Sequence, residues 1–185
     1  MRGRDQKGWT LVELMAGLVV SSIVTSMVVP AFKDVVDRSR LAVSANQLLT
    51  DLTMARQKGV MSGLPTTFCA GDPARGCTGN WSARTWIVFV DRDRDGRLGA
   101  NDVVLSRADL ASETSLTIAG NGPFGSAVVF DPIGTSQLSN GAFAAGTLRL
   151  CARGGRGANA TDLILAASGR VRAESRDLAG LCPSP

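Results

Sequence analysis

The C-terminal part of the chain carries arginines in a pattern that suits contact with phosphate groups. Residues 149–185 hold six arginines against three acids. Arg170 and Arg172 alternate along a predicted β-strand, so their side chains point to one face. If residues 147–153 and 161–174 form a hairpin, further arginines converge there, and the planar guanidinium suits bidentate phosphate contact. The predicted cluster comprises Arg149, Arg153, Arg156, Arg170, Arg172 and Arg176. The alternative is a solvated strand edge whose charges block pairing with another sheet.

A second charged stretch, DRDRDGRLGAND at residues 91–102, has the spacing of a calcium loop. Asp91, Asp93, Asp95 and Asp102 fall at positions 1, 3, 5 and 12 of that template, and Gly96 falls at position 6. Against calcium, position 12 is Asp rather than the longer Glu, arginines alternate with the acids, and no helices flank the loop. The sequence therefore favours a hairpin turn neutralised by its arginines, with no metal and no cofactor, and the alternative is a calcium-stabilised subunit.

The chain of 185 residues contains no histidine. Ser-His-Asp and Cys-His nucleophiles, HExxH zinc sites and histidine proton shuttles all require that side chain. The composition therefore predicts that the protein is not an enzyme.

The N-terminal part holds a long apolar run with one ionisable side chain. From Trp9 to Phe32 only Glu13 can carry a charge. The length is close to the ~20 helical residues that a bilayer core requires, and the basic residues before it place the N-terminus on the cytoplasmic side. A conventional secretory signal is shorter. A plain membrane anchor leaves Glu13 unexplained, because a lone carboxylate at that depth costs a few kcal/mol.

The four cysteines follow this translocated segment and are expected to form two disulfides. They contain no C-x-x-C pair, and a zinc site would need all four at scattered spacing. Of the three possible pairings we favour the sequential one, Cys69–Cys77 and Cys151–Cys182, because each bond then closes a local loop or ties down a terminus. Free buried thiols are the alternative.

The stretch KGWTLVELM resembles the leader of type IV pilins. In that family a prepilin peptidase cleaves after the glycine, the new first residue is N-methylated, and an acid stands at the fifth mature position. The resemblance implies cleavage between Gly8 and Trp9, with Trp in place of the usual Phe, and assigns Glu13 to assembly. Among other pilin subunits Glu13 would pair with an α-amino group in apolar surroundings, where unpaired charges are costly.

A helical pattern continues to about residue 60. Its apolar stripe recurs at spacings of three and four residues and consists of Leu41, Ala45, Leu48, Leu52 and Ala55. The opposite face is expected to be polar, with Asp37, Arg40, Asn46 and Asp51.

Beyond the helix, β-branched segments are bounded by Gly, Pro, Asn or Asp. The expected strands are residues 66–71, 84–91, 102–110, 115–120, 126–137, 146–154 and 161–175. The predicted fold class is α+β and pilin-like: a long N-terminal helix, membrane-spanning in its first half, packed on an antiparallel β-sheet.

An early cysteine pair around a tryptophan, followed by WIVFVDRDRDG, resembles the GspH/FimT branch of minor pilins and pseudopilins. FimT-type pilins, the most similar, carry a C-terminal Gly-Arg-x-Arg motif that binds DNA during natural transformation, and residues 169–172 fit it. Since the sequence offers no recognition helix and few aromatics, the implied contact is non-specific, to the backbone of double-stranded DNA. The alternative is a type II secretion minor pseudopilin with a structural or tip-assembly role, whose basic patch meets a neighbouring subunit.

The resemblance also implies the domain organisation and the location. Residues 1–8 would be the prepilin leader, 9–30 the transmembrane or filament-core helix, 31–60 an amphipathic helix half, and 61–185 a GspH/FimT-like β domain. The protein would pass once through the inner membrane with a periplasmic domain, and then assemble into a pilus or pseudopilus at the cell surface.

Overall fold

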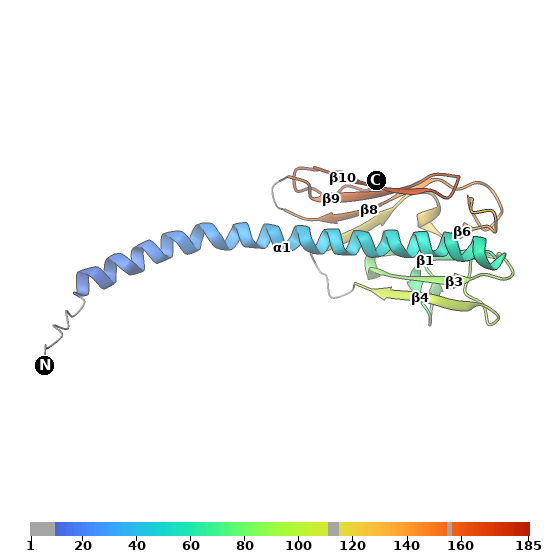
Figure 1. Ribbon diagram of the computed structural model, residues 1–185, viewed down its shortest axis with the longest axis horizontal. Coiled ribbons are helices and arrows are strands. Elements are labelled where there is room, and N and C mark those ends of the chain that lie inside the picture. The colour runs from blue at the N-terminus through green and yellow to red at the C-terminus, as the bar shows by residue number, and fades with distance from the viewer. Residues whose placement is uncertain (1–9, 111–114, 155–156) are drawn as a thin grey trace, which may run out of the picture. The chain divides into compact units, whose positions relative to one another are not determined.

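The computed structural model describes residues 10–110, 115–154 and 157–185 (Figure 1). It divides the chain into two units, residues 1–36 and 37–185. Helix α1 (Leu11–Ser62) is continuous over 52 residues, beginning in the first unit and ending in the second. The predicted helix, about residues 10 to 60, is therefore confirmed.

In the first unit the described large apolar side chains of α1 between Leu11 and Phe32 are exposed, while the hydroxyl groups there are satisfied within the helix. Ser21 Oγ donates to the Gly17 carbonyl at 2.8 Å, and Thr25 Oγ1 donates to the Ser21 carbonyl at 2.7 Å. Such bonds back to the preceding turn remove the polar cost of a hydroxyl in an apolar run.

Among the described residues, no helix is long and apolar enough to cross a membrane. The predicted membrane-spanning range 9–30 includes Trp9 and the side chains at 27, 29 and 30, which lie outside what the structure describes. That assignment stays a prediction.

In the second unit α1 buries the apolar stripe expected from the sequence. Leu48, Leu52 and Ala55 are fully buried, and Leu41 and Ala45 nearly so. The helix ends before Gly63, whose φ of +66° is a left-handed conformation that glycine adopts without strain.

The expectation that Asp51 lies on the polar face is wrong. Asp51 is buried, because its carboxylate accepts hydrogen bonds from Trp86 Nε1 at 2.7 Å and Ser106 Oγ at 3.0 Å. A buried carboxylate is tolerated where it is hydrogen-bonded. Asp51 is therefore not a solvated surface charge but a residue that joins the helix to the sheet.

The first sheet has six strands in the order β4-β3-β1-β6-β7, with β2 paired to the end of β1. The strands are β1 (Thr66–Asp72), β2 (Gly76–Cys77), β3 (Thr85–Val90), β4 (Val103–Asp109), β6 (Val128–Phe130) and β7 (Ser136–Gln137). The pairings are antiparallel. The predicted strand 126–137 is therefore two strands, separated by a turn at residues 131–135.

The second sheet has four antiparallel strands in the order β10-β9-β8-β5. They are β5 (Leu116–Gly120), β8 (Gly146–Ala152), β9 (Ala160–Leu165) and β10 (Val171–Arg176). The predicted strand 161–175 is wrong as one element, because the chain turns back at residues 166–170 and forms the β9–β10 hairpin.

The larger of two apolar clusters joins the second half of α1 to both sheets, and the smaller one contains Cys69, Ile87, Phe89 and Ala127. Figure 1 shows β8, β9 and β10 on one side of the second half of α1, and β1, β3 and β4 on the other. Buried side chains of the helix and of both sheets belong to the same cluster. Two 3-10 turns, η1 (Trp81–Ala83) and η2 (Gly122–Gly125), add Trp81 and Phe124, whose rings pack on Phe68. The α+β pilin-like fold class predicted from the sequence is confirmed.

Candidate nucleic-acid interface

The outer face of β10 carries a row of charged side chains. The register pairs Arg172 with Ile164, Glu174 with Asp162, and Arg176 with Ala160. Residues directly opposite in an antiparallel pair share a face, and the alternate residues of β9, Leu163 and Leu165, are buried in the core. Arg172, Glu174 and Arg176 therefore line the face away from the core, and we call this row, together with Arg170, the β10 stripe.

The tip of the β9–β10 hairpin is fixed by packing that only glycine allows. Gly169 has a φ of +75°, and a Cβ there would meet the Gly134 carbonyl. Arg56, on α1, donates from Nε to that carbonyl at 2.8 Å and from Nη2 to the Ser168 carbonyl at 3.4 Å. The glycine of the Gly-Arg-x-Arg motif is thus structurally required, and the hairpin holds Arg170 at its end.

The arginines of the β10 stripe differ in their pairing. Arg172 forms an ion pair with Glu174 at 3.2 Å, and Arg176 contacts both Glu174 at 2.7 Å and Asp162 at 3.4 Å. Arg170 is exposed, and within the described residues it forms no ion pair. One glutamate therefore pairs with two arginines, whereas Arg170 at the hairpin tip has no acidic partner within the described residues.

Arg149 is a structural residue rather than an available cation. Its guanidinium donates to both carboxylate oxygens of Asp162, Nε at 2.6 Å and Nη2 at 2.8 Å, and the two side chains are 13% and 4% exposed. The hydrogen bonds from Arg149 hold the pKa of Asp162 below its ordinary value, and those bonds raise the pKa of Arg149. This bidentate pair fixes β8 to β9 and leaves little of Arg149 for a ligand.

The expected convergence of all the arginines is wrong. Arg153 follows β8 at the end of the sheet near Arg176, whereas Arg170 lies at the opposite end. Since β9 has six residues at about 3.3 Å each, the two ends lie about 20 Å apart. The cause is the turn at residues 166–170, which the sequence analysis took as strand. Arg156 lies outside the described residues.

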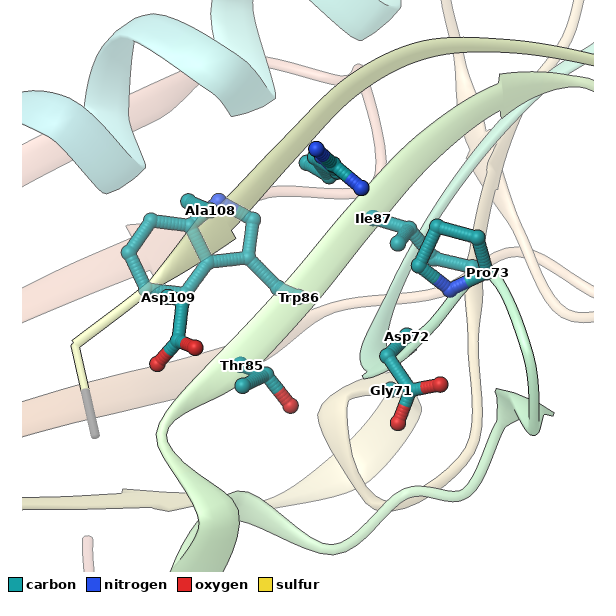
Figure 2. Close-up of a pocket in the computed structure, with 9 residues that line it drawn as sticks. Gly71, Asp72, Pro73, Thr85, Trp86, Ile87, Ala108 and Asp109 are labelled. Carbon is teal, nitrogen blue, oxygen red and sulfur yellow. The ribbon is translucent and has the colours of Figure 1, made fainter.

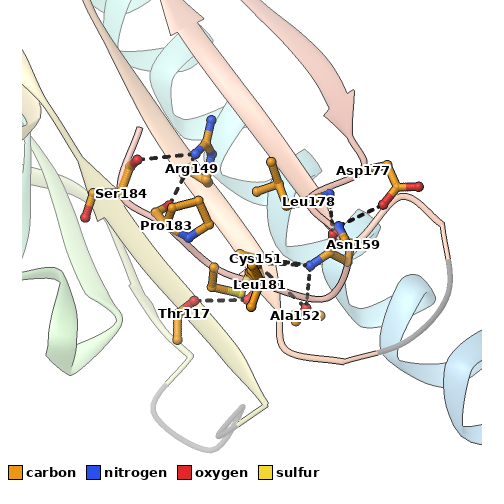
Figure 3. Close-up of a disulfide and its surroundings, with 12 residues drawn as sticks. Thr117, Arg149, Cys151, Ala152, Asn159, Asp177, Leu178, Leu181, Pro183 and Ser184 are labelled. Atoms are coloured by element: carbon orange, nitrogen blue, oxygen red, sulfur yellow. Dashed lines mark hydrogen bonds between the residues drawn. A yellow bond between two sulfur atoms is a disulfide. The ribbon is translucent and has the colours of Figure 1, made fainter.

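The C-terminal tail is tied down across the outer side of the second sheet (Figure 3). Cys151 is bonded to Cys182, with their Cα atoms 5.7 Å apart. Asn159 Nδ2 donates to the Leu181 carbonyl at 3.0 Å, and Arg149 Nη1 to the Pro183 carbonyl at 3.2 Å. The second disulfide, Cys69–Cys77, joins β1 to β2. The structure therefore has the sequential pairing that we favoured.

The acidic loop between β3 and β4 is organised by its own carboxylates. Asp91 is fully buried, and its Oδ2 accepts from Thr67 Oγ1 at 2.7 Å and Gly96 N at 3.0 Å. Asp102 accepts from the backbone N–H groups of Arg92 at 3.0 Å and Gly99 at 2.7 Å. Burial, first of all, raises the pKa of Asp91 above its ordinary value, and the neighbouring Asp93 and Asp102 add to this shift.

The predicted neutralisation of this loop by its arginines is wrong. Over the part of the chain that the structure describes, no ion pair joins Arg92, Arg94 or Arg97 to a carboxylate. All three arginines are exposed. The positive φ values of Arg94, +62°, and Gly96, +72°, turn the backbone sharply, so the acids bond to backbone and hydroxyl groups instead.

A pocket of about 390 Å³ opens where the end of β1 meets β3 and β4 (Figure 2). Its lining includes charges of both signs, Asp72, Arg107 and Asp109, and the end of Trp86. Asp72 is already paired with Arg75 at 2.6 Å. The mixed lining, without a cluster of convergent polar groups, gives no indication of a particular ligand.

Glu13 closes the first turn of α1. Its Oε2 accepts from the Thr10 backbone N–H at 3.0 Å, and Glu13 N donates to Thr10 Oγ1 at 3.3 Å. This is a capping box, in which residue and cap satisfy each other's donors. The Thr-x-x-Glu spacing signals it in the sequence, but the sequence analysis missed it. Gly8 and Trp9 lie outside the described residues, and the cleavage site stays a prediction.

Arg56 and Asn159 position the site but were also missed from the sequence. No local pattern marks Arg56, because its partner Gly134 is 78 residues away. Asn159 precedes β9 and bonds to Leu178 N, Ala152 O and Leu181 O. Only the fold brings these groups together.

Comparison with known proteins places the chain in a family. Residues 44–169 match the family model described as type II transport protein GspH, and residues 3–29 match the prokaryotic N-terminal methylation motif. No curated protein matches the sequence.

Solved structures of two proteins share the fold. The type IV minor pilin FimU of Pseudomonas aeruginosa aligns with a TM-score of 0.54 at 19% identity, over 74% of this chain and 90% of that one. The minor pseudopilin EpsH from the type 2 secretion system of Vibrio cholerae aligns with a TM-score of 0.51 at 13% identity, over 73% of this chain and 96% of that one. The family model covers most of the β-rich unit, and the methylation motif covers the N-terminal segment. The chain therefore belongs to the GspH family of minor pilins and pseudopilins.

Proposed function

We propose that this minor pilin binds double-stranded DNA without sequence preference through the β10 stripe, during DNA uptake in natural transformation. The observation that carries the proposal is the exposed Arg170 at a hairpin tip, which forms no ion pair within the described residues, with Arg172 two residues further along. Guanidinium groups in this arrangement suit contact with backbone phosphates. Such contacts position a protein on DNA but read no sequence.

Within this proposal the arginines have different roles. Arg170 leads, and Arg172 and Arg176 exchange Glu174 for phosphate when DNA approaches. Arg153, at the far end of the sheet, reaches phosphates only along the length of a duplex, and Arg149 supports the strands through Asp162. With two to four phosphate contacts, affinity per subunit is weak and strongly salt-dependent. Several subunits in one filament would raise it by avidity.

The proposal includes the events before assembly. Prepilin peptidase cleaves between Gly8 and Trp9 and leaves an N-terminus that is methylated. The helix that carries Glu13 rests in the inner membrane until neighbouring pilin subunits take it into a filament. There Glu13 exchanges its contact with Thr10 for the α-amino group of a neighbour, since a pair replaces two unpaired charges in apolar surroundings.

A gel-shift titration of the full chain in a non-ionic detergent tests the DNA proposal. Duplexes of unrelated sequence are titrated at two salt concentrations, beside the Arg170→Gln/Arg172→Gln double variant. The matched control is Arg92→Gln/Arg97→Gln, which removes two exposed charges from the acidic loop. We expect equal affinity for all duplexes, a loss of about 40-fold between 50 and 200 mM salt for three contacts, and loss of binding in the first double variant alone.

The second candidate function is a type II secretion pseudopilin with a structural role. It is favoured by the pairing of Arg172 and Arg176 with Glu174, which lowers the charge available to DNA, and by the likeness to EpsH. In that case the β10 stripe contacts a neighbouring subunit. Absence of a shift at low salt, or equal shifts in both double variants, would favour this function over DNA capture.

A further inference from the structure

Three carboxylates of the acidic loop lie close enough together to hold one ion. One carboxylate oxygen from each of Asp91, Asp93 and Asp95 lies within 4.8 Å of those of the other two. Asp93 and Asp95 are exposed, whereas Asp91 forms the buried floor of the group. Because exposed acids often gather without binding a ligand, only the buried carboxylate of Asp91 can indicate a bound ion.

Asp91 is buried with one of its oxygens unsatisfied. The residue is 0% exposed. Thr67 and Gly96 bond to Oδ2, but Oδ1 has no hydrogen-bond partner among the described residues. A buried carboxylate oxygen without a partner is costly, and such groups in native proteins usually have an ion, water or functional role to account for them.

No neighbouring cation of the protein compensates this charge. Over the described residues, Arg92, Arg94 and Arg97 form no ion pair with any of the three acids. The loop therefore gathers three carboxylates beside one another, one of them in a buried position, while its three arginines are exposed.

We propose that Asp91, Asp93 and Asp95 bind a divalent cation of the calcium type. The donors are all oxygens, and the molecule has no histidine and no free cysteine among its four, so a soft or borderline metal has no suitable ligands. Asp102 closes the loop instead of acting as a ligand, because both its oxygens accept backbone N–H groups. The proposal is independent of DNA binding.

The ligand set predicts a weak site. Three carboxylates leave the rest of the coordination sphere to backbone carbonyls and water, and sites of this kind in extracellular modules bind calcium at about 10⁻⁴–10⁻³ M. Because Thr67 lies on β1 and Asp91 follows β3, the ion would fix the β3–β4 loop to the middle of the first sheet.

Isothermal titration of the metal-free full chain in a non-ionic detergent tests this site. Calcium chloride is titrated at constant ionic strength, with magnesium chloride as the comparison ion. Asp93→Asn and Asp95→Asn each remove one negative charge from an exposed ligand and keep its oxygen, without disturbing the buried bonds of Asp91. Asp177→Asn makes the same charge change outside the loop and keeps an oxygen for the Ala179 N–H. Circular dichroism checks that each variant is folded.

We expect one saturable site for calcium, weaker binding of magnesium, and an unchanged constant in Asp177→Asn. Each loop variant should weaken calcium binding at least tenfold and lose the rise in melting temperature that calcium gives the parent chain. Either of two results would overturn the proposal: no saturable heat up to about 10 mM calcium, or the same constant in the loop variants as in the parent.

Discussion

The acidic loop at residues 91–102 and the β10 stripe both combine acids with arginines, but they organise them in opposite ways. Over residues 91–95 aspartates alternate with arginines, whereas over residues 170–176 three arginines and one glutamate stand at every second position. In the β10 stripe and its neighbour β9, the acids form ion pairs with arginines: Glu174 pairs with Arg172 and Arg176, and Asp162 pairs with Arg149. In the loop, Asp91 and Asp102 accept hydrogen bonds from backbone N–H and hydroxyl groups. The arginines there form no ion pair in the described structure.

The difference follows from the backbone. Along a strand, residues two apart stand on the same face about 6–7 Å from each other, within reach of long side chains. In the loop, left-handed conformations at Arg94 and Gly96 turn N–H groups toward the carboxylates. Opposite charges two residues apart therefore predict ion pairing in a pleated strand, whereas opposite charges on adjacent residues predict little in a tight turn.

The largest change in stability is expected when the buried arginine, Arg149, is removed. Arg149→Ala leaves Asp162, whose side chain is 4% exposed, with only the longer contact to Arg176. Breaking a buried pair by removing one partner is strongly destabilising, and with Arg176 remaining we expect a loss of about 2–4 kcal/mol in the free energy of unfolding. Urea unfolding followed by circular dichroism measures this change.

Arg170→Ala is the matched control for that test. Its side chain is exposed and forms no ion pair within the described residues, so we expect a change within about 0.5 kcal/mol. Equal losses in the two variants would contradict the contrast between a structural and an available arginine.

The same pair predicts how stability depends on pH. The bonds from Arg149 lower the pKa of Asp162 in the folded state. Asp162 therefore contributes stability fully above its unfolded pKa of about 4, and this contribution is lost as the pH falls toward the folded value. Urea unfolding at a series of pH values between about 6 and 3 should show the difference between the parent and Arg149→Ala shrinking below about pH 4. If the difference in the free energy of unfolding between the two proteins stayed constant over this range, the Arg149–Asp162 pair would not be the source of that difference.

A smaller effect is expected in the acidic loop. Asp102→Ala removes the acceptor for the N–H groups of Arg92 and Gly99, which are then left to water in a half-exposed loop. We expect a loss of about 1 kcal/mol. Asp102→Asn keeps one carbonyl oxygen and should recover part of the stability. If Asn behaved like Ala, the charge of Asp102 rather than its backbone bonds would be what matters.

Much of the fold could be predicted from the sequence because it depends on local patterns. The apolar stripe from Leu41 to Ala55 has helical spacing, and the two disulfides follow sequential order. The turn between β9 and β10 was missed although Ser168-Gly169 is a dipeptide typical of turns, because the segment was taken as one continuous strand. That one turn decides which arginines lie together.

The candidate site could be predicted only in part, because it depends on contacts between distant segments. The exposure of Arg170 and Arg172 follows from their position, but the pairing of Arg149 with Asp162 depends on the β8–β9 register. Asp51 was expected on the polar face because helical periodicity does not show that Trp86 and Ser106 donate hydrogen bonds to its carboxylate in the folded protein. Burial of a single acid is decided by its partners.

The smallest expected effect concerns the acid of the β10 stripe, and it depends on the proposed DNA binding. Glu174→Gln releases both Arg172 and Arg176 from an ion pair and removes a negative charge beside them. Exposed ion pairs are worth at most about 1 kcal/mol, so DNA affinity should rise by no more than about fivefold, with a salt dependence steeper by about one counterion. Gel shifts at several salt concentrations measure both quantities, with Asp177→Asn as the control of equal charge. An unchanged affinity together with an unchanged salt dependence in Glu174→Gln would mean that DNA does not approach this face, because any duplex along the β10 stripe must pass Glu174.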